Sequence, residues 1–330
     1  MVATATKSLA LGLESTAAWG TAVTRTVRLA GLTDVEFHPL PNVYRVPELG
    51  RMGPSKLTTL LSNSAEGTVN IDATHEHLIY LWQSVFGAVS ASGTSGSGIF
   101  AYPFSAPSTG VPTAASYTGE YTDSTSAYLL NGLIAKTLNV SGKAGEVWKA
   151  QADFIARNMT TGVLTTTLAD VSPLVNLIRM ADTNLYIDIS TGTVGTTVVS
   201  AGLIEFELSL ESNYHTKLFG GAYIPGSFGP DKWDGSLRVM MELGSTARAL
   251  FDALISTGYS TVVRQLEIRG AQSTSLMTQI QANGVITNNP ELWGDRDGNR
   301  ALEFVFSGVD STTLGTWLKA IATIGSSTIT

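Results

Sequence analysis

The stretch Gly67–Gly87, GTVNIDATHEHLIYLWQSVFG, changes its hydrophobic period halfway along. Val69 and Ile71 alternate with polar residues, which is the pattern of a strand with one buried face. Further on, apolar residues recur at the i, i+3, i+4, i+7 and i+8 spacing of an amphipathic helix, at Leu78, Leu81, Trp82, Val85 and Phe86. Thr74 is a suitable N-cap, and Gly87 is a suitable stop. The stretch predicts a strand, a short turn and a helix.

The same unit recurs as Gly235–Thr257, GSLRVMMELGSTARALFDALIST. Leu237 and Val239 repeat the alternation 168 positions after Val69 and Ile71. The helical stripe returns 169 positions on, at Ala247, Leu250, Phe251, Leu254 and Ile255. The recurrence predicts a tandem duplication.

Two shorter matches extend the repeat. Val35–Phe37 corresponds to Ile204–Phe206 at a similar offset. Thr137–Gly142 resembles Gln265–Gly270, but here the offset is only 128. Part of the first copy therefore has no counterpart in the second.

The unmatched part is segment 88–127, which is rich in Ser, Thr, Gly and Ala and has no hydrophobic period. We predict two copies of one domain, at residues 1–165 and 166–330, with segment 88–127 as an inserted loop in the first. Its aromatic side chains are unusual for a flexible linker, so we expect part of it to dock on the protein: Phe100, Tyr102, Phe104, Tyr117 and Tyr121.

Each copy is predicted to be mainly β with one flanking helix. Strands of the first copy are expected at Val27–Leu32, Val35–His38, Gly67–Asp72, Ile134–Ser141 and Glu146–Arg157. Strands of the second are expected at Leu185–Ile189, Thr197–Leu210, Gly235–Met241, Val263–Arg269, Ser275–Ala282 and Ala301–Gly308.

Two long excursions rich in Pro and Gly lie at matching places in the two copies, at Pro39–Gly67 and Ser212–Gly235. Long loops without a strand or helix pattern are often functional. We expect both excursions to make contacts between subunits.

Composition narrows the class of protein. The chain has 330 residues, a net charge of -7 and a pI near 5.1, which argues against a protein that grips DNA phosphates. Only 14% of residues are charged, so we expect much of the surface either to consist of Ser, Thr, Gly and Asn or to be covered by a partner chain, and the second option points to assembly. Cysteine is absent, which leaves the redox compartment open. No signal-peptide pattern opens the sequence and no apolar run is long enough to span a membrane, so a soluble protein made in the cytoplasm is expected.

Candidate chemical sites are weak. His75 and His77 lie two apart, so on a helix they point about 200° apart and cannot share one metal ion. Asp295–Asn299 has acidic residues at alternate positions, as calcium-binding loops do, but its glycine is at the fourth position and not the sixth. A hairpin turn is therefore favoured. Gly93–Gly98, GTSGSG, lacks the lysine of a phosphate loop. We expect no catalytic residue, no cofactor and no metal.

The segment Gly12–Val23, GLESTAAWGTAV, resembles the opening of many tail tube (major tail) proteins of long-tailed bacteriophages. The order of strands, projecting loop, strand-helix joint and closing hairpin is also similar to theirs. The resemblance implies two packed β-sheets in a sandwich or barrel-like fold, flanked by a helix. It also implies subunits that join edge to edge into rings, and rings that stack into a hollow tube.

Members of that family usually have one such domain and form hexameric rings, so a duplicated chain implies a trimer with pseudo-sixfold symmetry. The implied partners are other copies of the chain and the tape measure, tail terminator and distal tail proteins. Viral DNA would pass through the lumen without specific binding. The implied location is the virion, with assembly in the host cytoplasm and no membrane contact.

Contacts between stacked rings are expected in Leu49–Leu61 and Tyr214–Trp233. The residues proposed are Leu49, Arg51, Met52, Leu57, Leu60, Leu61, Tyr214, Leu218, Phe219, Tyr223, Ile224, Phe228 and Trp233.

Two alternatives stay open at this stage. One is another β-rich virion or surface-binding module, used for decoration or adhesion, which would not polymerise. The other is a β-sandwich hydrolase using paired carboxylates such as Glu205 and Glu207, which alternate on one strand. That spacing is equally expected of a solvated sheet face.

Overall fold

The computed structural model describes residues 7–14, 19–29, 31–45, 58–94, 98–109, 114–122, 126–165, 168–170, 176–199, 202–257, 263–291, 295–296 and 298–326. Of the described residues, 59% lie in strands and 10% in helices, so the prediction of a mainly β protein is confirmed.

The elements of the first half are β1 (Ser8–Leu13), β2 (Val27–Leu29), β3 (Leu32–Arg45), β4 (Thr58–Asp72), α1 (His75–Phe86), β5 (Ser92–Thr94), β6 (Ile99–Ser105), β7 (Tyr117–Thr122), β8 (Ala127–Lys143), β9 (Lys149–Ala156) and β10 (Asn158–Gly162). Those of the second are β11 (Ala169–Asp170), β12 (Thr183–Ile189), β13 (Leu203–Glu211), β14 (His215–Lys217), β15 (Ser227–Gly229), β16 (Asp234–Glu242), α2 (Ser245–Thr257), β17 (Val263–Ser273), β18 (Leu276–Ile286), β19 (Asp295–Arg296), β20 (Asn299–Gly308) and β21 (Leu318–Ile324).

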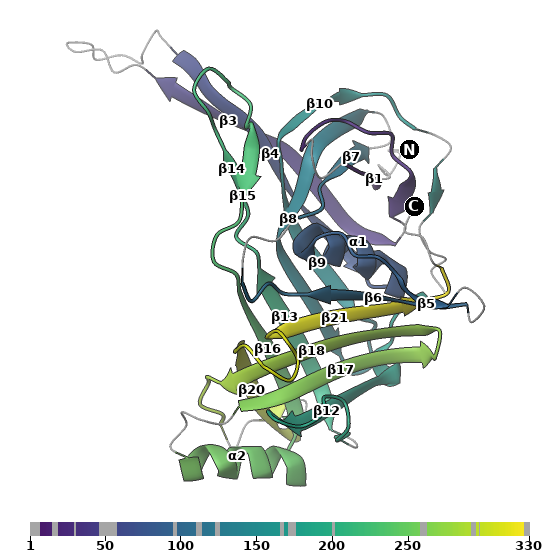
Figure 1. Ribbon diagram of the computed structural model, residues 1–330, viewed down its shortest axis with the longest axis vertical. Helices are drawn as coiled ribbons and strands as arrows, with labels where there is room; N and C mark the ends of the chain where they lie inside the picture. Colours follow the sequence, from purple (N-terminus) through teal and green to yellow (C-terminus); the bar gives the residue numbers. More distant parts are fainter. Residues whose placement is uncertain are drawn as a thin grey trace, which may run out of the picture.

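Seven antiparallel strands form a continuous wall, here called the central sheet, in the order β3-β4-β9-β8-β13-β16-β20 (Figure 1). Its middle joint, β8 with β13, unites the two halves of the chain. Because strand residues alternate between faces, the register decides which side chains share a face. On the buried face, paired positions run across six strands through Ile71, Ala150, Val140, Leu208, Leu237 and Phe306.

The joint between β4 and α1 is as predicted. The Thr74 side chain accepts a hydrogen bond from the backbone N–H of His77 at 3.1 Å, and the helix ends at Gly87, whose φ is 102°. The predicted stripe is buried, but so are nearly all other residues of α1. Trp82 packs on Phe104 of β6 with ring centroids 5.9 Å apart, and the Ser84 hydroxyl accepts from the backbone of β8. The helix is therefore enclosed on several sides.

The inserted segment supplies part of this enclosure. The sequence predicted a loop over 88–127, whereas the structure has β5, β6 and β7 there. Strand β6 pairs with β21 from the other end of the chain, and β7 pairs with β1 and β8. The predicted docking is confirmed, because four of the five aromatic side chains are buried and Phe100 packs partly buried against the core: Tyr102, Phe104, Tyr117 and Tyr121.

Helix α2 is less covered. Ala247, Leu250 and Leu254 of its predicted stripe are buried, but Ile255 is 55% exposed. Strand β17 begins at Val263, so no long segment follows α2 to enclose it. The exposure of Ile255 corrects the prediction for that residue, and the reason is the missing counterpart of the insert.

Strand pairing recurs between the halves. The pairs β1–β7, β3–β4, β4–β9, β7–β8, β8–β9 and β8–β10 have counterparts in β12–β17, β13–β16, β16–β20, β17–β18, β18–β20 and β18–β21. This pattern aligns β8 with β18, whereas the sequence comparison matched Thr137–Gly142 of β8 to Gln265–Gly270 of β17. The β-strand similarity of those two segments came from their shared alternation and not from their place in the sheet.

Candidate functional site

Two hairpins project from the body of the molecule. In Figure 1, β3 and β4 reach beyond the other strands at the upper left, and β14 and β15 run beside them. Residues 39–45 of β3 and 58–61 of β4 are exposed throughout. The first predicted excursion is therefore a pair of strands over its described part, and the second contains the short paired strands β14 and β15. The two excursions lie together.

Hydrogen bonds hold the two hairpins side by side. The backbone N–H of Asn63 in β4 donates to the carbonyl of Tyr223 at 2.8 Å. The Arg157 guanidinium donates to the carbonyl of Pro225 at 2.9 Å. The excursion of the second half therefore rests on strands of the first half.

The hairpins carry a concentration of exposed apolar side chains, here called the hairpin surface: Leu40, Val43, Tyr44, Leu60, Leu61, Leu218, Phe219, Tyr223 and Ile224. Phe219 is 58% exposed and Tyr223 is 63% exposed. Single exposed apolar residues need no explanation, but a gathering of this size on one projection is typical of a surface that a partner covers.

Nine of the thirteen residues proposed for contacts between subunits lie in the described part of the chain. Leu49, Arg51, Met52 and Leu57 lie outside it. Six of the nine belong to the hairpin surface: Leu60, Leu61, Leu218, Phe219, Tyr223 and Ile224.

The other three residues hold the base of the β14–β15 hairpin. Tyr214 is only 1% exposed, and its hydroxyl donates to the carbonyl of Val85 in α1 at 3.3 Å. Phe228 and Trp233 are half-buried against it, with ring centroids 5.6 and 6.1 Å from that of Tyr214. The placement of Tyr214 corrects the expectation that it is available to a neighbour, because composition alone does not separate an anchor from a contact.

The second feature is the outer face of the central sheet, which is polar in every strand. One row of paired positions runs across all seven strands through Asp34, Asn70, Gln151, Asn139, Ser209, Ser236 and Ser307. Acidic side chains on this face outnumber basic ones, with Asp34, Glu36, Glu66, Asp72, Asp153, Glu205, Glu207, Glu211, Asp234, Glu242 and Glu303 against Lys136, Lys143, Lys149 and Arg238.

The carboxylates considered for hydrolysis lie on this face. Arg238 of β16 forms ion pairs with Glu205, with Glu207 at 3.1 Å and with Glu303 at 2.9 Å. Burial alone would lower the pKa of Arg238, but its hydrogen bond to Glu303 and the three carboxylates raise that pKa on balance. Glu205 and Glu207 thus share one permanent cation, which fits a charge network on a sheet face.

The two histidines of the opening stretch are interior groups. The His75 ring nitrogen Nδ1 lies 2.8 Å from the Thr278 hydroxyl, and Glu76 accepts from the Asn176 side chain. Burial lowers the pKa of His75 to about 4. The predicted hairpin at Asp295–Asn299 is supported in its described residues, because Asp295 pairs with Arg300 and Arg296 with Asn299 across β19 and β20.

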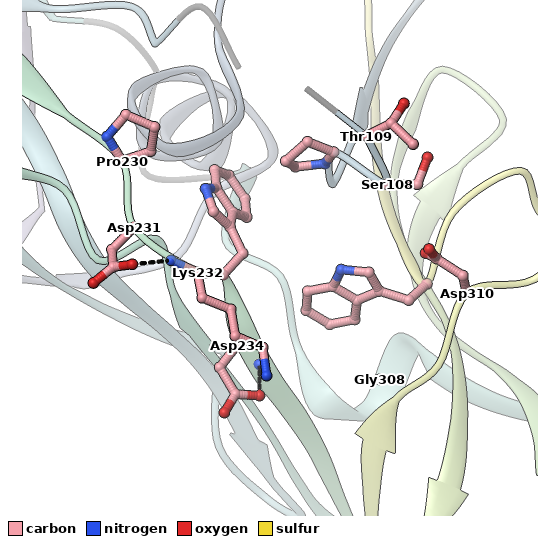
Figure 2. A pocket seen from close by; sticks show the side chains of 12 residues that line it. Ser108, Thr109, Pro230, Asp231, Lys232, Asp234, Gly308 and Asp310 are labelled. Carbon is pink, nitrogen blue, oxygen red and sulfur yellow. Dashed lines mark hydrogen bonds between the residues drawn. The ribbon is translucent and has the colours of Figure 1, made fainter. Parts of the chain in front are cut away.

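A cleft of about 530 Å³ lies beside the base of the β14–β15 hairpin. Figure 2 shows Ser108, Thr109 and Asp310 on one side of it, and Pro230, Asp231, Lys232 and Asp234 on the other. Trp233 and Trp317 also line it. Asp231 and Asp234 each accept a hydrogen bond from the next residue's backbone N–H at 2.8 Å, so both side chains are held in place.

Comparison with known families decides the class of protein. The model of the phage tail tube protein family matches residues 4–325, which is nearly the whole chain. The chain belongs to the phage tail tube protein family. A search of curated proteins found no match. The resemblance inferred from Gly12–Val23 is confirmed.

Tail tube proteins are structural components of the phage tail, and the family is not one of enzymes. Membership implies self-assembly and contact with other tail proteins in the virion. Neither described helix of this tail tube protein is long and apolar enough to cross a membrane.

The motif that carried the resemblance has a structural role in this tail tube protein. The Glu14 carboxylate is 3% exposed and accepts four hydrogen bonds. The donors are the backbone N–H groups of Gly20 and Gly132 and the hydroxyls of Ser116 and Thr118, at 2.8 to 2.9 Å. Glu14 therefore ties the end of β1 to β7 and β8.

Proposed function

We propose that this tail tube protein forms stacked rings whose bore carries the phage DNA, and that the outer face of the central sheet lines the bore. The observation that carries the proposal is the row of polar residues that runs in register across both halves, from Asp34 to Ser307. An antiparallel sheet often has one solvated polar face, and joining such sheets edge to edge around a ring would turn this face into a continuous polar lining.

Charge on this face suits a conduit. Its carboxylates outnumber its basic side chains, so it repels the DNA backbone and does not retard the passing duplex. The ion pairs of Arg238 with Glu205, Glu207 and Glu303 remove the one basic side chain in the middle of the second half as a phosphate ligand. DNA is thus a passenger and not a bound partner.

We further propose a ring of three chains with pseudo-sixfold symmetry, each chain supplying two copies at residues 1–165 and 166–330. The six recurring strand pairs support the duplication. The same pairs support an insert that begins after α1 and ends before β7, which is a shorter segment than 88–127.

The hairpin surface is the proposed contact between stacked rings. It projects beyond the sheet, and its side chains remain exposed within one chain. Leu49, Arg51, Met52 and Leu57 belong to the same proposal on the strength of their sequence position alone.

The remaining parts of the proposal follow from the family. The tape measure, tail terminator and distal tail proteins are the proposed partners, with assembly in the host cytoplasm. The protein does no chemistry and needs no cofactor, and the shared cation of Glu205 and Glu207 supports this reading.

The test is negative-stain electron microscopy of the purified chain over a concentration series, with light scattering for the mass of the smallest species. Hollow tubes with a regular axial repeat, built from monomers or trimers, are expected. A chain that stays monomeric at high concentration, even when tail initiation proteins are added, would overturn the proposal.

A second candidate function, surface binding, is favoured by one observation. Indole rings beside carboxylates, as in the cleft of Trp233 and Trp317, are chemistry that binds sugars. Saturable quenching of tryptophan fluorescence by oligosaccharides in a chain that forms no tubes would support this function instead.

A further inference from the structure

We propose that the contact between the two halves inside one chain is the template for the contact between neighbouring chains in the ring. On this proposal, β3 of one chain pairs with the end of β18 of the next, with Glu36 opposite Thr287. The inference rests on the proposed ring. It specifies which strands pair between neighbouring chains, in which direction they run and which residues lie opposite each other.

The first step is the alignment of the two sheets. Gly67 of β4 pairs with Phe37 of β3, and Gly235 of β16 pairs with Leu210 of β13. Since Gly67 and Gly235 occupy the same place in the repeated stretch, Phe37 corresponds to Leu210. The strand pairing thus shifts the earlier match of Val35–Phe37 to Ile204–Phe206 by four residues.

The second step aligns β8 with β18. Leu138 of β8 pairs with Ala152 of β9, and Ile286 of β18 pairs with Phe306 of β20. Ala152 and Phe306 pair in turn with Val69 and Leu237, through β4 and β16. Because Val69 and Leu237 are matched residues of the repeat, Leu138 corresponds to Ile286.

These two correspondences define which residues pair between neighbouring chains. Inside the chain, Leu138 lies opposite Leu210, and Asn139 lies opposite Ser209. Substituting the corresponding residues places Ile286 opposite Phe37 of the next chain, and Thr287 opposite Glu36. The first pair is apolar on both sides, and the second is polar and exposed on both sides, so the register keeps each face of the wall uniform.

Both strand edges required by this joint are open in the described residues. Strand β3 pairs only with β4, and β17 pairs with β18 only as far as Val285. Beyond that point, Thr287 donates its backbone N–H to Val305, and the Asn288 side chain bonds to the backbone of Glu303 and Val305. Among the described residues, 286–289 thus follow β20 on one side and face no strand on the other.

The cleft fits the same template. In the first half, Asn63 and Arg157 bond to the β14–β15 hairpin of the second half. The corresponding residues of the second half are Asp231, which lines the cleft, and Ser311, which directly follows the cleft residue Asp310. The segment that corresponds to the β14–β15 hairpin is the β3–β4 hairpin, so the cleft is where the next chain's β3–β4 hairpin rests.

Disulfide formation in assembled tubes tests the register, because the chain has no cysteine. The pair Glu36→Cys and Thr287→Cys is expected to form covalent multimers on oxidation, since residues opposite on adjacent strands have Cβ atoms about 5 Å apart. If the ring holds three chains, the largest covalent multimer seen in denaturing electrophoresis should be the trimer. A second pair, Asp34→Cys with Asn289→Cys, repeats the test two residues along.

Two matched variants serve as controls. Asn139→Cys with Ser209→Cys, the internal equivalent, should close within one chain and leave the band a monomer. Thr68→Cys with Thr287→Cys should stay reduced, because Thr68 lies one strand beyond Glu36, about 10 Å from Thr287. If wild-type tubes form and the internal pair closes while both test pairs stay monomeric, the register is wrong although the tube itself stands.

Discussion

Buried carboxylates and imidazoles show how single residues hold this fold. Glu14 is the clearest case, since one carboxylate accepts from two backbone groups and two hydroxyls. We predict that Glu14→Gln lowers the free energy of unfolding by about 3 kcal/mol, because the amide turns a donor toward buried donors. Urea denaturation measures this, with Glu36→Gln on the exposed face as the control. A loss no larger than that of the control would contradict the role of Glu14.

His75 makes stability depend on pH. Burial lowers its pKa from 6.5 to about 4, with a smaller opposing effect from Asp182. Between these values the unfolded chain binds a proton that the folded chain does not, so stability is complete above pH 6.5 and falls as the pH drops toward 4. The loss amounts to about 3 kcal/mol.

The measurement is the urea midpoint from pH 7 to pH 4.5 for the wild type and His75→Gln. The variant keeps a partner for Thr278 but does not titrate, so its midpoint should fall less steeply over this range. His38→Gln, at an exposed position, is the control and should follow the wild type. Equal slopes for all three proteins would show that His75 is not the titrating group.

At the scale of the element, the projecting hairpins contain some residues that stabilise the fold and others that are exposed for assembly. Phe219 and Tyr223 are exposed, whereas Tyr214 anchors the hairpin to α1. We predict that Phe219→Ser with Tyr223→Ser changes the melting temperature little and reduces tube elongation at least about tenfold, as loss of a contact worth about 1.4 kcal/mol would. Turbidity and electron microscopy measure elongation.

Ile189→Ser is the matched control, because Ile189 is 62% exposed on β12 and lies outside the hairpin surface. It should elongate like the wild type. Elongation of the double variant at the wild-type rate would remove the hairpin surface from the ring-stacking contact.

At the scale of the whole molecule, the lining of the bore is open to a direct test. We predict that a cysteine at Ser209 reacts with a large polymer-linked maleimide in monomers but is protected in long tubes. Thr246 is an exposed residue of α2, which packs on the face of the sheet opposite the polar face. A cysteine at this position should react in monomers and in tubes alike. Equal reactivity of the Ser209 variant in tubes and monomers would show that the polar face does not line the bore.

The sequence predicted the elements whose two faces differ in chemistry. Val69, Ile71, Leu237 and Val239 alternate with polar residues because one face of the central sheet is wet, and every predicted strand overlaps an observed one. Strand β21 was missed because small residues, Ala320 and Ala322, make its buried face and weaken the hydrophobic alternation.

The surfaces were harder to predict than the strands. Strand β6 was assigned to a loop because its neighbours are Ser- and Gly-rich, although Tyr102 and Phe104 alternate as strand residues do. The excursions were located correctly, but aromatic content did not distinguish Tyr214, which is interior, from Tyr223, which is exposed. Both errors arise because tertiary contacts, and not local composition, decide burial.

The insert helps to enclose α1 and has no counterpart over the partly exposed α2, which has a consequence for symmetry. In the proposed ring of three chains, the polar wall would repeat nearly six times around the bore, whereas the insert would repeat three times around the outside. A DNA duplex inside would meet an almost sixfold surface. A protein that clasps the tube from outside would meet three grooves and three ridges, and a threefold partner could dock on it in one set of equivalent positions.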